Sequence, residues 1–409
     1  MARNILFITT DQQRFDSLGC NGGTVARTPH ADRLAAQGIN FRRAYDQNAV
    51  CMPARSTMLT GQYPRTHGVV ANGIALPTDA PTVAGYLRER GGYRTALIGK
   101  AHFEPGFDPH LRFEEGARAA RGDTGDWRGF DYGKPEHWLA YYEGRWPNME
   151  GGPAAFVPAG LTDDQVREVN AKTHIMNELV DEACGKVLAT VDARGWGENT
   201  DVLFTTDHGE LQGDMGLLYK GPFHVDALMR IPLIWRPAPS AGLAPAVVAD
   251  PVGQVDLAPT FCAIAGIEPA GWMQGAALPR YDGEGDRQRM LCEWDSQFPG
   301  YGMHLRSIYR DGRLCTVYEP STAGRPNGLE RTWGDGVLAP CPVVYAATEK
   351  GPGGIAIATG ELYRVEDDPH QWENHFDDPF FRAVRDDLIA DLYDHLPRER
   401  RELLVDAPA

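Results

Sequence analysis

The sequence is poor in cysteine, and its cysteines do not stand in close pairs. Seven Cys residues occur among 409, an odd number, and none form a Cys-x-x-Cys arrangement. Small secreted proteins that depend on disulfides carry dense, evenly numbered cysteines. The composition therefore argues against a disulfide framework and predicts reduced, mostly structural thiols.

Long hydrophobic runs are also missing. No apolar stretch approaches the length of about 20 residues that a membrane-spanning helix needs. Near the N-terminus, the apolar run from Ile5 to Ile8 is too short for the core of a signal peptide, and polar residues follow it at once. We therefore predict a cytoplasmic protein with no membrane partner.

Positive charge is scarce relative to negative charge. Lys and Arg number 40 against 56 Asp and Glu, which gives a formal net charge of −16. A negative surface repels nucleic acids and long polyanions such as sulfated polysaccharides, although a local basic pocket can override the global field. Small anionic substrates are favoured, and nucleic acid is not expected as a partner.

What is present is the pattern of an α/β protein. A chain of this length suits one large domain with an appendage, or two domains. Short apolar runs at residues 4–10, 94–99, 201–206 and 231–235 predict buried parallel strands, and helices are expected from residue 28, over 82–90 and over 163–191. Alternating strands and helices predict a large, mainly parallel sheet covered by helices on both faces.

The texture of the sequence changes after about Pro279. Residues 281–358 are rich in Gly, Pro and short β-like pieces such as 313–318, which is typical of an antiparallel sheet. An amphipathic helix is expected from about residue 379 to 396. We predict a catalytic α/β domain over 1–280 and a smaller α+β subdomain over 281–409, with an antiparallel sheet and a terminal helix.

Two of the predicted strands end in the same way. Both run into Thr-Thr, followed by Asp11 and Gln12 in one case and by Asp207 and His208 in the other. Ligands of α/β sheets bind at the carboxyl ends of strands, so these four side chains are expected to meet at one metal ion. The alternative is that each Asp caps the helix or turn that follows it.

The run from Cys51 to Arg55 predicts a nucleophile at a helix start. Pro53 suits the first turn of a helix, because its missing N–H would have no partner there. The free N–H groups and the helix dipole stabilise an anion beside Cys51, and Arg55 returns to the same face one turn later. The alternative is a small buried cysteine that begins an ordinary helix.

This run resembles the signature of the sulfatase family, and the resemblance continues through residues 59–68. In that family, the signature cysteine is oxidised to formylglycine by a maturation enzyme. The resemblance implies an alkaline-phosphatase-like fold and a sulfuric ester hydrolase that cleaves a small sulfate monoester. It also implies that one hydroxyl of the hydrated aldehyde attacks sulfur to give a sulfate hemiacetal. Loss of the proton from the second hydroxyl then expels sulfate by C–O cleavage, a route closed to an unmodified Cys51.

The resemblance further implies a cation site. Asp11, Gln12, Asp207, His208 and the modified Cys51 would bind Ca²⁺, with Mn²⁺ or Mg²⁺ as second choices. Most sulfatases carry a second carboxylate in place of Gln12 and often Asn in place of His208. Gln12 instead resembles the phosphonate monoester hydrolase branch, so a phosphonate monoester or phosphodiester hydrolase is an alternative. A pseudo-sulfatase that binds anions through an unmodified Cys51 is a second alternative.

Further catalytic residues follow from the resemblance. Arg55 would orient the diol, and Lys100 and His102 match a Gly-Lys-x-His element, in which Lys binds sulfate and His carries a proton or binds the diol. Lys220 would contact sulfate and the leaving oxygen, and His224 is a candidate for substrate contact. The alternative for Lys100 and His102 is a solvated loop.

Two further residues have both a catalytic and a structural interpretation. Asn72 corresponds to a family Asn next to the nucleophile, but it is also a plausible turn residue before Gly73. The interval 103–163 lacks the usual strand whose His protonates the leaving group, so His174 is the substitute, with a structural role as its alternative. The aromatic residues of 127–146 form either a lid over an apolar ester or ordinary packing.

Overall fold

The computed structural model describes most of the catalytic signatures and the cores around them. It describes residues 3–104, 114–135, 156–157, 162–221, 223–283, 285–295, 304–319, 349–350, 356–357 and 360–398. Within these residues, no helix is long and apolar enough to cross a membrane.

The central sheet has five strands in the order β1-β6-β8-β2-β9. Strand β1 (Asn4–Thr10) runs parallel to β6 (Thr200–Thr206), and β2 (Ile39–Tyr45) runs parallel to β9 (Ala246–Gly253). Strand β8 (Leu233–Arg236) is antiparallel to both β6 and β2. The prediction of a parallel strand at 231–235 is thus wrong in direction, because an apolar run indicates burial but not orientation.

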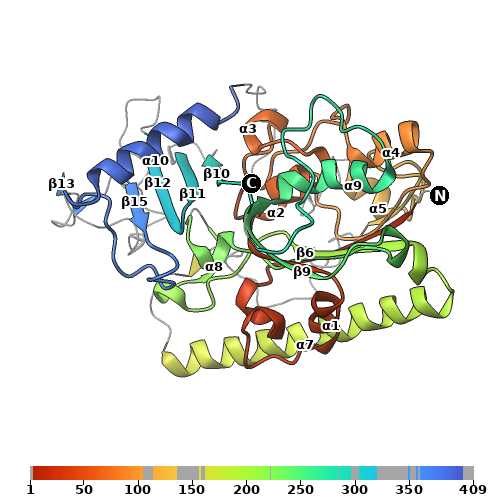
Figure 1. Ribbon diagram of the computed structural model, residues 1–409, viewed down its shortest axis with the longest axis horizontal. Helices are drawn as coiled ribbons and strands as arrows, with labels where there is room; N and C mark the ends of the chain where they lie inside the picture. The colour runs from red at the N-terminus through yellow and green to blue at the C-terminus, as the bar shows by residue number, and fades with distance from the viewer. Residues whose placement is uncertain are drawn as a thin grey trace.

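Helices cover both faces of this sheet, as predicted (Figure 1). Helices α1 (Pro29–Ala36) and α7 (Asp163–Ala193) pack together on one face. Helices α2 (Cys51–Thr60), α4 (Val83–Gly91) and α9 (Leu257–Ala265) pack together on the other. The long helix α7 begins at a capping box, in which the Thr162 side chain accepts the backbone N–H of Gln165.

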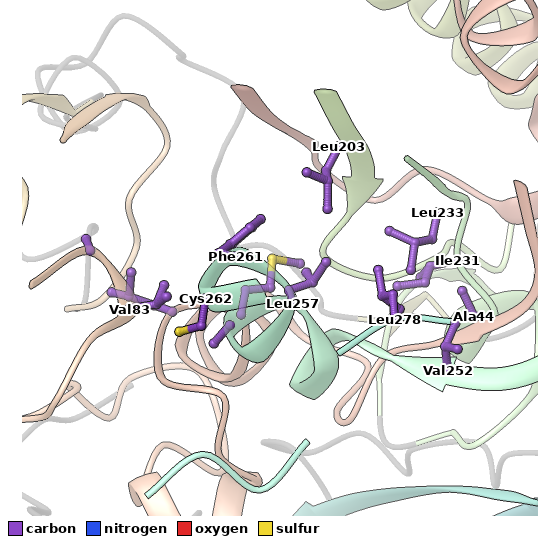
Figure 2. Packing of buried hydrophobic residues seen from close by; sticks show 14 of the residues in the cluster. Ala44, Val83, Leu203, Ile231, Leu233, Val252, Leu257, Phe261, Cys262 and Leu278 are labelled. Carbon is purple, nitrogen blue, oxygen red and sulfur yellow. The ribbon is translucent and has the colours of Figure 1, made fainter. Parts of the chain in front are cut away.

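Side chains that alternate along the strands pack into two hydrophobic cores, one on each face of the sheet. On β6, Val202 and Phe204 belong to the core under α1 and α7, whereas Leu203 belongs to the core with α9. Figure 2 shows Leu203 pointing toward the helix that carries Leu257 and Phe261. Successive strand side chains face opposite sides, so a strand covered on both faces must be apolar throughout. The continuous apolar run of 202–204 is explained in this way.

Strand β3 (Ala96–Gly99) departs from the predicted layout. It pairs in parallel with β4 (Tyr132–Pro135) in a separate two-stranded sheet. Ile98 of β3 is 75% exposed, so this strand is not a buried member of the central sheet. The Tyr93 hydroxyl, just before β3, donates to the backbone oxygen of Arg3 at 2.7 Å and joins this region to the start of β1.

The C-terminal part contains the predicted antiparallel sheet. Its strands β10 (Arg289–Asp295), β11 (His304–Arg310), β12 (Arg313–Glu319) and β15 (Gly360–Tyr363) lie in that order. Helix α10 (Arg382–His395) packs on this sheet through Leu388 and Leu392. The boundary between residues 280 and 281 stays a prediction.

Short elements complete the described chain. The remaining helices and strands are α3 (Pro64–His67), α5 (Glu114–Ala120), α8 (Asp226–Met229), β5 (Phe156–Val157), β7 (Leu218–Tyr219), β13 (Glu349–Lys350) and β14 (Ala356–Ile357). The 3-10 turns span Phe15–Ser17, Gly19–Asn21, Gly197–Asn199, Asp214–Gly216, Pro239–Ala241 and Gln254–Asp256.

Candidate active site

The register of β1 and β6 brings the first two acidic candidates together. Thr10 lies opposite Thr206, so Asp11 and Asp207 leave the sheet side by side at its carboxyl edge. The backbone N–H of Gln12 donates to Asp207 Oδ1 at 2.9 Å, and that of His208 donates to the same oxygen at 3.1 Å. Residues almost 200 positions apart in the sequence are therefore joined directly.

Cys51 is the first residue of α2, and the helix start is held by a side chain from another loop. Val50 occupies the N-cap position and supplies no side-chain acceptor. Asn72 takes this part instead, because its Oδ1 accepts the backbone N–H of Met52 at 2.9 Å. Free N–H groups at a helix start need such a partner. Asn72 therefore lies beside the nucleophile and organises the first turn that carries it.

Four candidate ligands converge around Cys51. One ligand atom each from Asp11, Cys51, Asp207 and His208 lie within 4.8 Å of one another. His208 Nδ1 lies 2.8 Å from the Gly209 carbonyl oxygen and Nε2 lies 3.3 Å from Cys51 Sγ. Because the carbonyl can only accept, Nδ1 carries a proton and Nε2 faces the cluster, where it offers a lone pair whenever the imidazole is neutral. Two carboxylates and this imidazole fit a divalent cation.

Arg55 joins the two halves of this cluster. Its Nε donates to Asp207 Oδ2 at 3.0 Å, and its Nη2 donates to Asp11 Oδ2 at 3.1 Å. The same guanidinium also donates to the backbone oxygens of Lys100 and Thr10. The side chain is buried, and each of its three nitrogen atoms bonds to an acceptor in a low-dielectric site.

Lys220 directly follows β7 and contacts Cys51. Its Nζ lies 2.8 Å from Cys51 Sγ and 2.9 Å from Gln12 Oε1. Gln12 Nε2 donates to the Glu210 carboxylate. Since an ammonium only donates and a carboxylate only accepts, the two contacts determine the orientation of the Gln12 amide. Its carbonyl oxygen therefore accepts from the Lys220 ammonium, which also contacts Cys51 Sγ.

Lys100 and His102 enter the site from the turn after β3. Lys100 Nζ contacts Asp11, and the His102 side chain lies close enough to Cys51 for each to influence the pKa of the other. Burial is the largest influence on the pKa of His102 and lowers it, so the neutral imidazole is favoured. A neutral imidazole beside the nucleophile can accept a proton.

The charges around Cys51 favour its thiolate. Burial raises the pKa of Cys51, but the positive Lys220 and His208 oppose it, and the net pKa lies well below the usual range. Burial similarly lowers the pKa of Lys220, yet negative Cys51 and Asp11 outweigh it and leave a raised pKa. The Cys51 sulfur marks the position at which a nucleophilic oxygen would lie if this residue were oxidised and hydrated.

Comparison with known proteins assigns this chain to a family. The family described as Sulfatase matches residues 3–119 and 134–267, which is more than half of the chain. The chain belongs to the sulfatase family. An ulvan-active sulfatase of Formosa agariphila is 24% identical over 95% of this chain and 80% of its own length. An N-acetylglucosamine-6-O-sulfatase of Bacteroides thetaiotaomicron is 39% identical over 26% of this chain and 19% of its own length.

Solved structures confirm the alkaline-phosphatase-like fold of this sulfatase. The phosphonate monoester hydrolase of Agrobacterium radiobacter superposes with a TM-score of 0.70 at 20% identity and covers 97% of both chains. A putative sulfatase from Bacteroides thetaiotaomicron gives a TM-score of 0.71 at 18% identity, covering 100% of this chain and 96% of that one. At such identities the likeness concerns the fold alone.

Two predicted histidines of this sulfatase have other surroundings. His224 is buried, its Nδ1 lies 2.5 Å from Ser307 Oγ of β11, and burial lowers its pKa to about 3. A histidine so buried stays neutral, and its assignment to the catalytic group stays a prediction. His174 lines a cavity of about 320 Å³ beside Arg14 and Gln212, and no contact described for it reaches Cys51. Residues 136–155, with most of the expected aromatic lid, lie outside the described part.

Sequence reasoning missed two acidic residues that touch this site. Glu210 follows Asp207 and His208 closely, so its place in the ligand loop was a usable signal. Glu115 lies on α5, and its carboxylate accepts the backbone N–H groups of His102 and Phe103. No pattern in the sequence marks Glu115, because it acts on backbone atoms that every residue carries.

Proposed function

We propose that this sulfatase hydrolyses small sulfate monoesters, using a formylglycine formed from Cys51 and a bound divalent cation. The observation that carries the proposal is the convergence of Asp11, Asp207 and His208 on Cys51 at the start of a buried helix. Three cationic side chains surround the same point, as the three equatorial oxygens of a sulfuryl group under in-line attack would need. Family membership supports the same reading.

Two groups would complete the chemistry. A hydrated formylglycine at position 51 supplies an oxygen nucleophile at neutral pH. A divalent cation held by Asp11, Gln12, Asp207, His208 and residue 51 supplies positive charge next to the reacting group. The oxygen-rich donor set supports Ca²⁺, with Mn²⁺ or Mg²⁺ as second choices given the imidazole of His208.

The chain's own residues would divide the remaining work. Lys220 and Lys100 bind sulfate oxygens and neutralise charge, and Lys220 also lies near enough to the nucleophile to face the leaving oxygen. Arg55 holds the two aspartates in place and lies one turn after residue 51. His102 takes the proton that the nucleophile releases. Each of these groups is already oriented by a contact that precedes substrate binding, which lowers the cost of reorganisation.

Mass spectrometry of the peptide that contains Cys51 tests the nucleophile. Active protein, produced together with a formylglycine-generating maturation enzyme, should show an aldehyde or its hydrate in place of the thiol. The variant Cys51→Ala should bind the cation but lose turnover of 4-nitrophenyl sulfate. An unmodified thiol in protein that turns over this ester would contradict the proposal. Removal of the cation with a chelator and its return should abolish and restore activity.

A phosphonate monoester hydrolase remains the second candidate. Gln12 and His208 favour it, because they make the ligand set less anionic than the usual sulfatase set. Its fold neighbours include phosphonate monoester hydrolases, which supports the architecture for either reaction. Comparison of kcat/KM for 4-nitrophenyl sulfate and for 4-nitrophenyl phenylphosphonate decides between them. We expect sulfate to be preferred, and a phosphonate preference would reverse the order. Turnover of either ester excludes a pseudo-sulfatase.

A further inference from the structure

The turn that carries His102 has an unfavourable backbone conformation. His102 has a φ of 55°, in the left-handed region that a side chain with a Cβ rarely adopts. Such a conformation costs about 1 kcal/mol or more and persists only where neighbouring groups impose it. The group that imposes it should therefore contact the backbone of the turn.

Glu115 makes that contact from outside the catalytic signatures. Its Oε1 accepts the N–H of His102 at 2.8 Å, and its Oε2 accepts the N–H of Phe103 at 2.9 Å. The Phe103 carbonyl in turn accepts the backbone N–H of Leu76 at 2.7 Å. One carboxylate thus holds two consecutive amide groups, at the residue whose imidazole lies beside Cys51.

Glu115 is itself held in place. Its backbone N–H donates to Glu104 Oε2 at 2.5 Å, and Arg128 Nη2 donates to Glu104 Oε1 at 2.5 Å. These side chains are buried or nearly so. A buried, well-connected network costs much when one member is removed, so it fits a positioning function better than a surface contact does.

We propose that Glu115 is a positioning residue, whose carboxylate holds the backbone of His102 and Phe103 and so directs the His102 imidazole at the nucleophile. This inference rests on the proposed function of the site, because it concerns the group that takes the nucleophile's proton. It does not depend on whether the ester is a sulfate or a phosphonate.

A double-mutant cycle between positions 115 and 102 tests the proposal. Since Glu115 acts through His102, Glu115→Ala should lower kcat about 10²-fold in the wild-type background and have little further effect after His102→Ala. KM should change little. Glu115→Gln keeps the size but offers only one acceptor oxygen, so an intermediate loss of about tenfold is expected. Assays belong well above pH 7, because burial and Glu104 raise the pKa of Glu115 to about 7.

The neighbouring residue supplies a matched control. Glu114 also lies in the first turn of α5, but its side chain is exposed, and its ion-pair partners among the described residues are Arg118 and Arg121, at 3.9 Å each. Glu114→Ala should leave kcat unchanged. Equal losses from Glu115→Ala in both backgrounds, or a loss matched by Glu114→Ala, would overturn the inference. If Glu115→Ala does not fold, Glu115→Gln completes the cycle with the same criteria.

The cycle also separates this inference from the proposed function. It uses whichever ester the wild type hydrolyses. A wild type that turns over only the phosphonate contradicts the sulfatase proposal and leaves the cycle intact. The other outcome is a wild type that hydrolyses the sulfate ester while the effects of the substitutions at positions 115 and 102 on kcat simply add. That result supports the sulfatase proposal and contradicts the positioning role of Glu115.

Discussion

Arg55 neutralises the buried charge on which the site depends. Asp207 has a fully buried side chain, and Arg55 is the cation that bonds to it directly. Burying a carboxylate without a partner is costly, whereas a geometrically matched guanidinium offsets that cost. The same guanidinium holds Asp11, so one residue sets the separation of two ligand candidates.

Arg55→Ala should therefore destabilise the whole protein as well as inactivate it. We expect a fall of about 3–5 kcal/mol in the free energy of unfolding, because Asp207 is left buried and unpaired. Urea denaturation followed by tryptophan fluorescence measures this fall. The control Arg167→Ala removes an exposed arginine of α7 and should change stability by less than about 0.5 kcal/mol. Equal effects of the two variants would contradict the prediction.

Glu210 should influence cation affinity although it is not a ligand. Its carboxylate orients the Gln12 amide, and removal of such an outer partner weakens metal binding about 10–100-fold. Calorimetric titration of Glu210→Ala with Ca²⁺ measures this change. Asp214→Asn is the matched control, because Asp214 lies in the same loop and bonds to Arg14 at 2.7 Å rather than to a ligand candidate. An unchanged Kd for Glu210→Ala would refute the prediction.

At the level of residues, the sequence identified those that a local pattern marks. Asp11 and Asp207 follow strands, and Cys51 and Arg55 stand one helical turn apart, so simple spacing rules place them. Glu210 bonds to a residue 198 positions away, and that contact exists only after the sheet has formed. His224 follows Lys220 closely in the sequence, but its imidazole meets Ser307 of β11, a contact that sequence spacing does not predict.

Strand β15 of the C-terminal sheet carries a buried carboxyl group. Glu361 of β15 is buried, accepts the Tyr318 hydroxyl at 2.6 Å, and has no partner for Oε2 among the described residues. Burial raises the pKa of Glu361 to about 8. The folded sheet therefore keeps a proton that the unfolded chain releases near its ordinary pKa of 4.5.

This acid should make the protein less stable as pH rises. Between about pH 4.5 and pH 8 the folded state binds more protons than the unfolded state, so the free energy of unfolding falls with increasing pH. Over that window the loss from Glu361 is on the order of 5 kcal/mol. Glu361→Gln should flatten the slope measured by urea denaturation at several pH values. Glu373→Gln, at an exposed position after the same strand, should leave the slope as it is.

Elements with strong local signals were predicted almost to the residue. The expected helix of 163–191 corresponds to Asp163–Ala193, since its capping box and length mark it clearly. The expected strand of 4–10 corresponds to Asn4–Thr10. Strand β8 was found but given the wrong direction, and β3 was placed in the wrong sheet. Both errors concern pairing, which depends on tertiary contacts rather than on periodicity.

At the scale of the whole molecule, Glu293 of β10 links the two parts. Its carboxylate accepts the backbone N–H and the Nε of Arg65, at 2.9 and 2.6 Å. Its backbone carbonyl accepts Nδ2 of Asn48 at 2.8 Å, and its N–H donates to the Gln47 oxygen at 3.0 Å. Arg65 belongs to the extended sulfatase motif, so part of that motif holds the C-terminal sheet.

We therefore expect the central sheet and the C-terminal sheet to unfold together. Circular dichroism and tryptophan fluorescence should give coincident urea transitions for the full chain. Glu293→Ala breaks a buried ion pair with Arg65 and should lower the free energy of unfolding by about 3–5 kcal/mol. Two separate transitions in the wild-type protein would show instead that the parts are independent.

The contacts of β10 with residues 46–48 affect whether the C-terminal sheet can be exchanged between related enzymes. Asp46, Gln47 and Asn48 lead directly to Cys51, and the Cys292 thiol adds a further contact to the Asp46 oxygen at 2.7 Å. The C-terminal sheet is thus a support for the nucleophile and not an interchangeable module. Exchanging it with that of a relative, in order to transplant specificity, should disturb the rate of the chemical step unless the loop before Cys51 is exchanged with it.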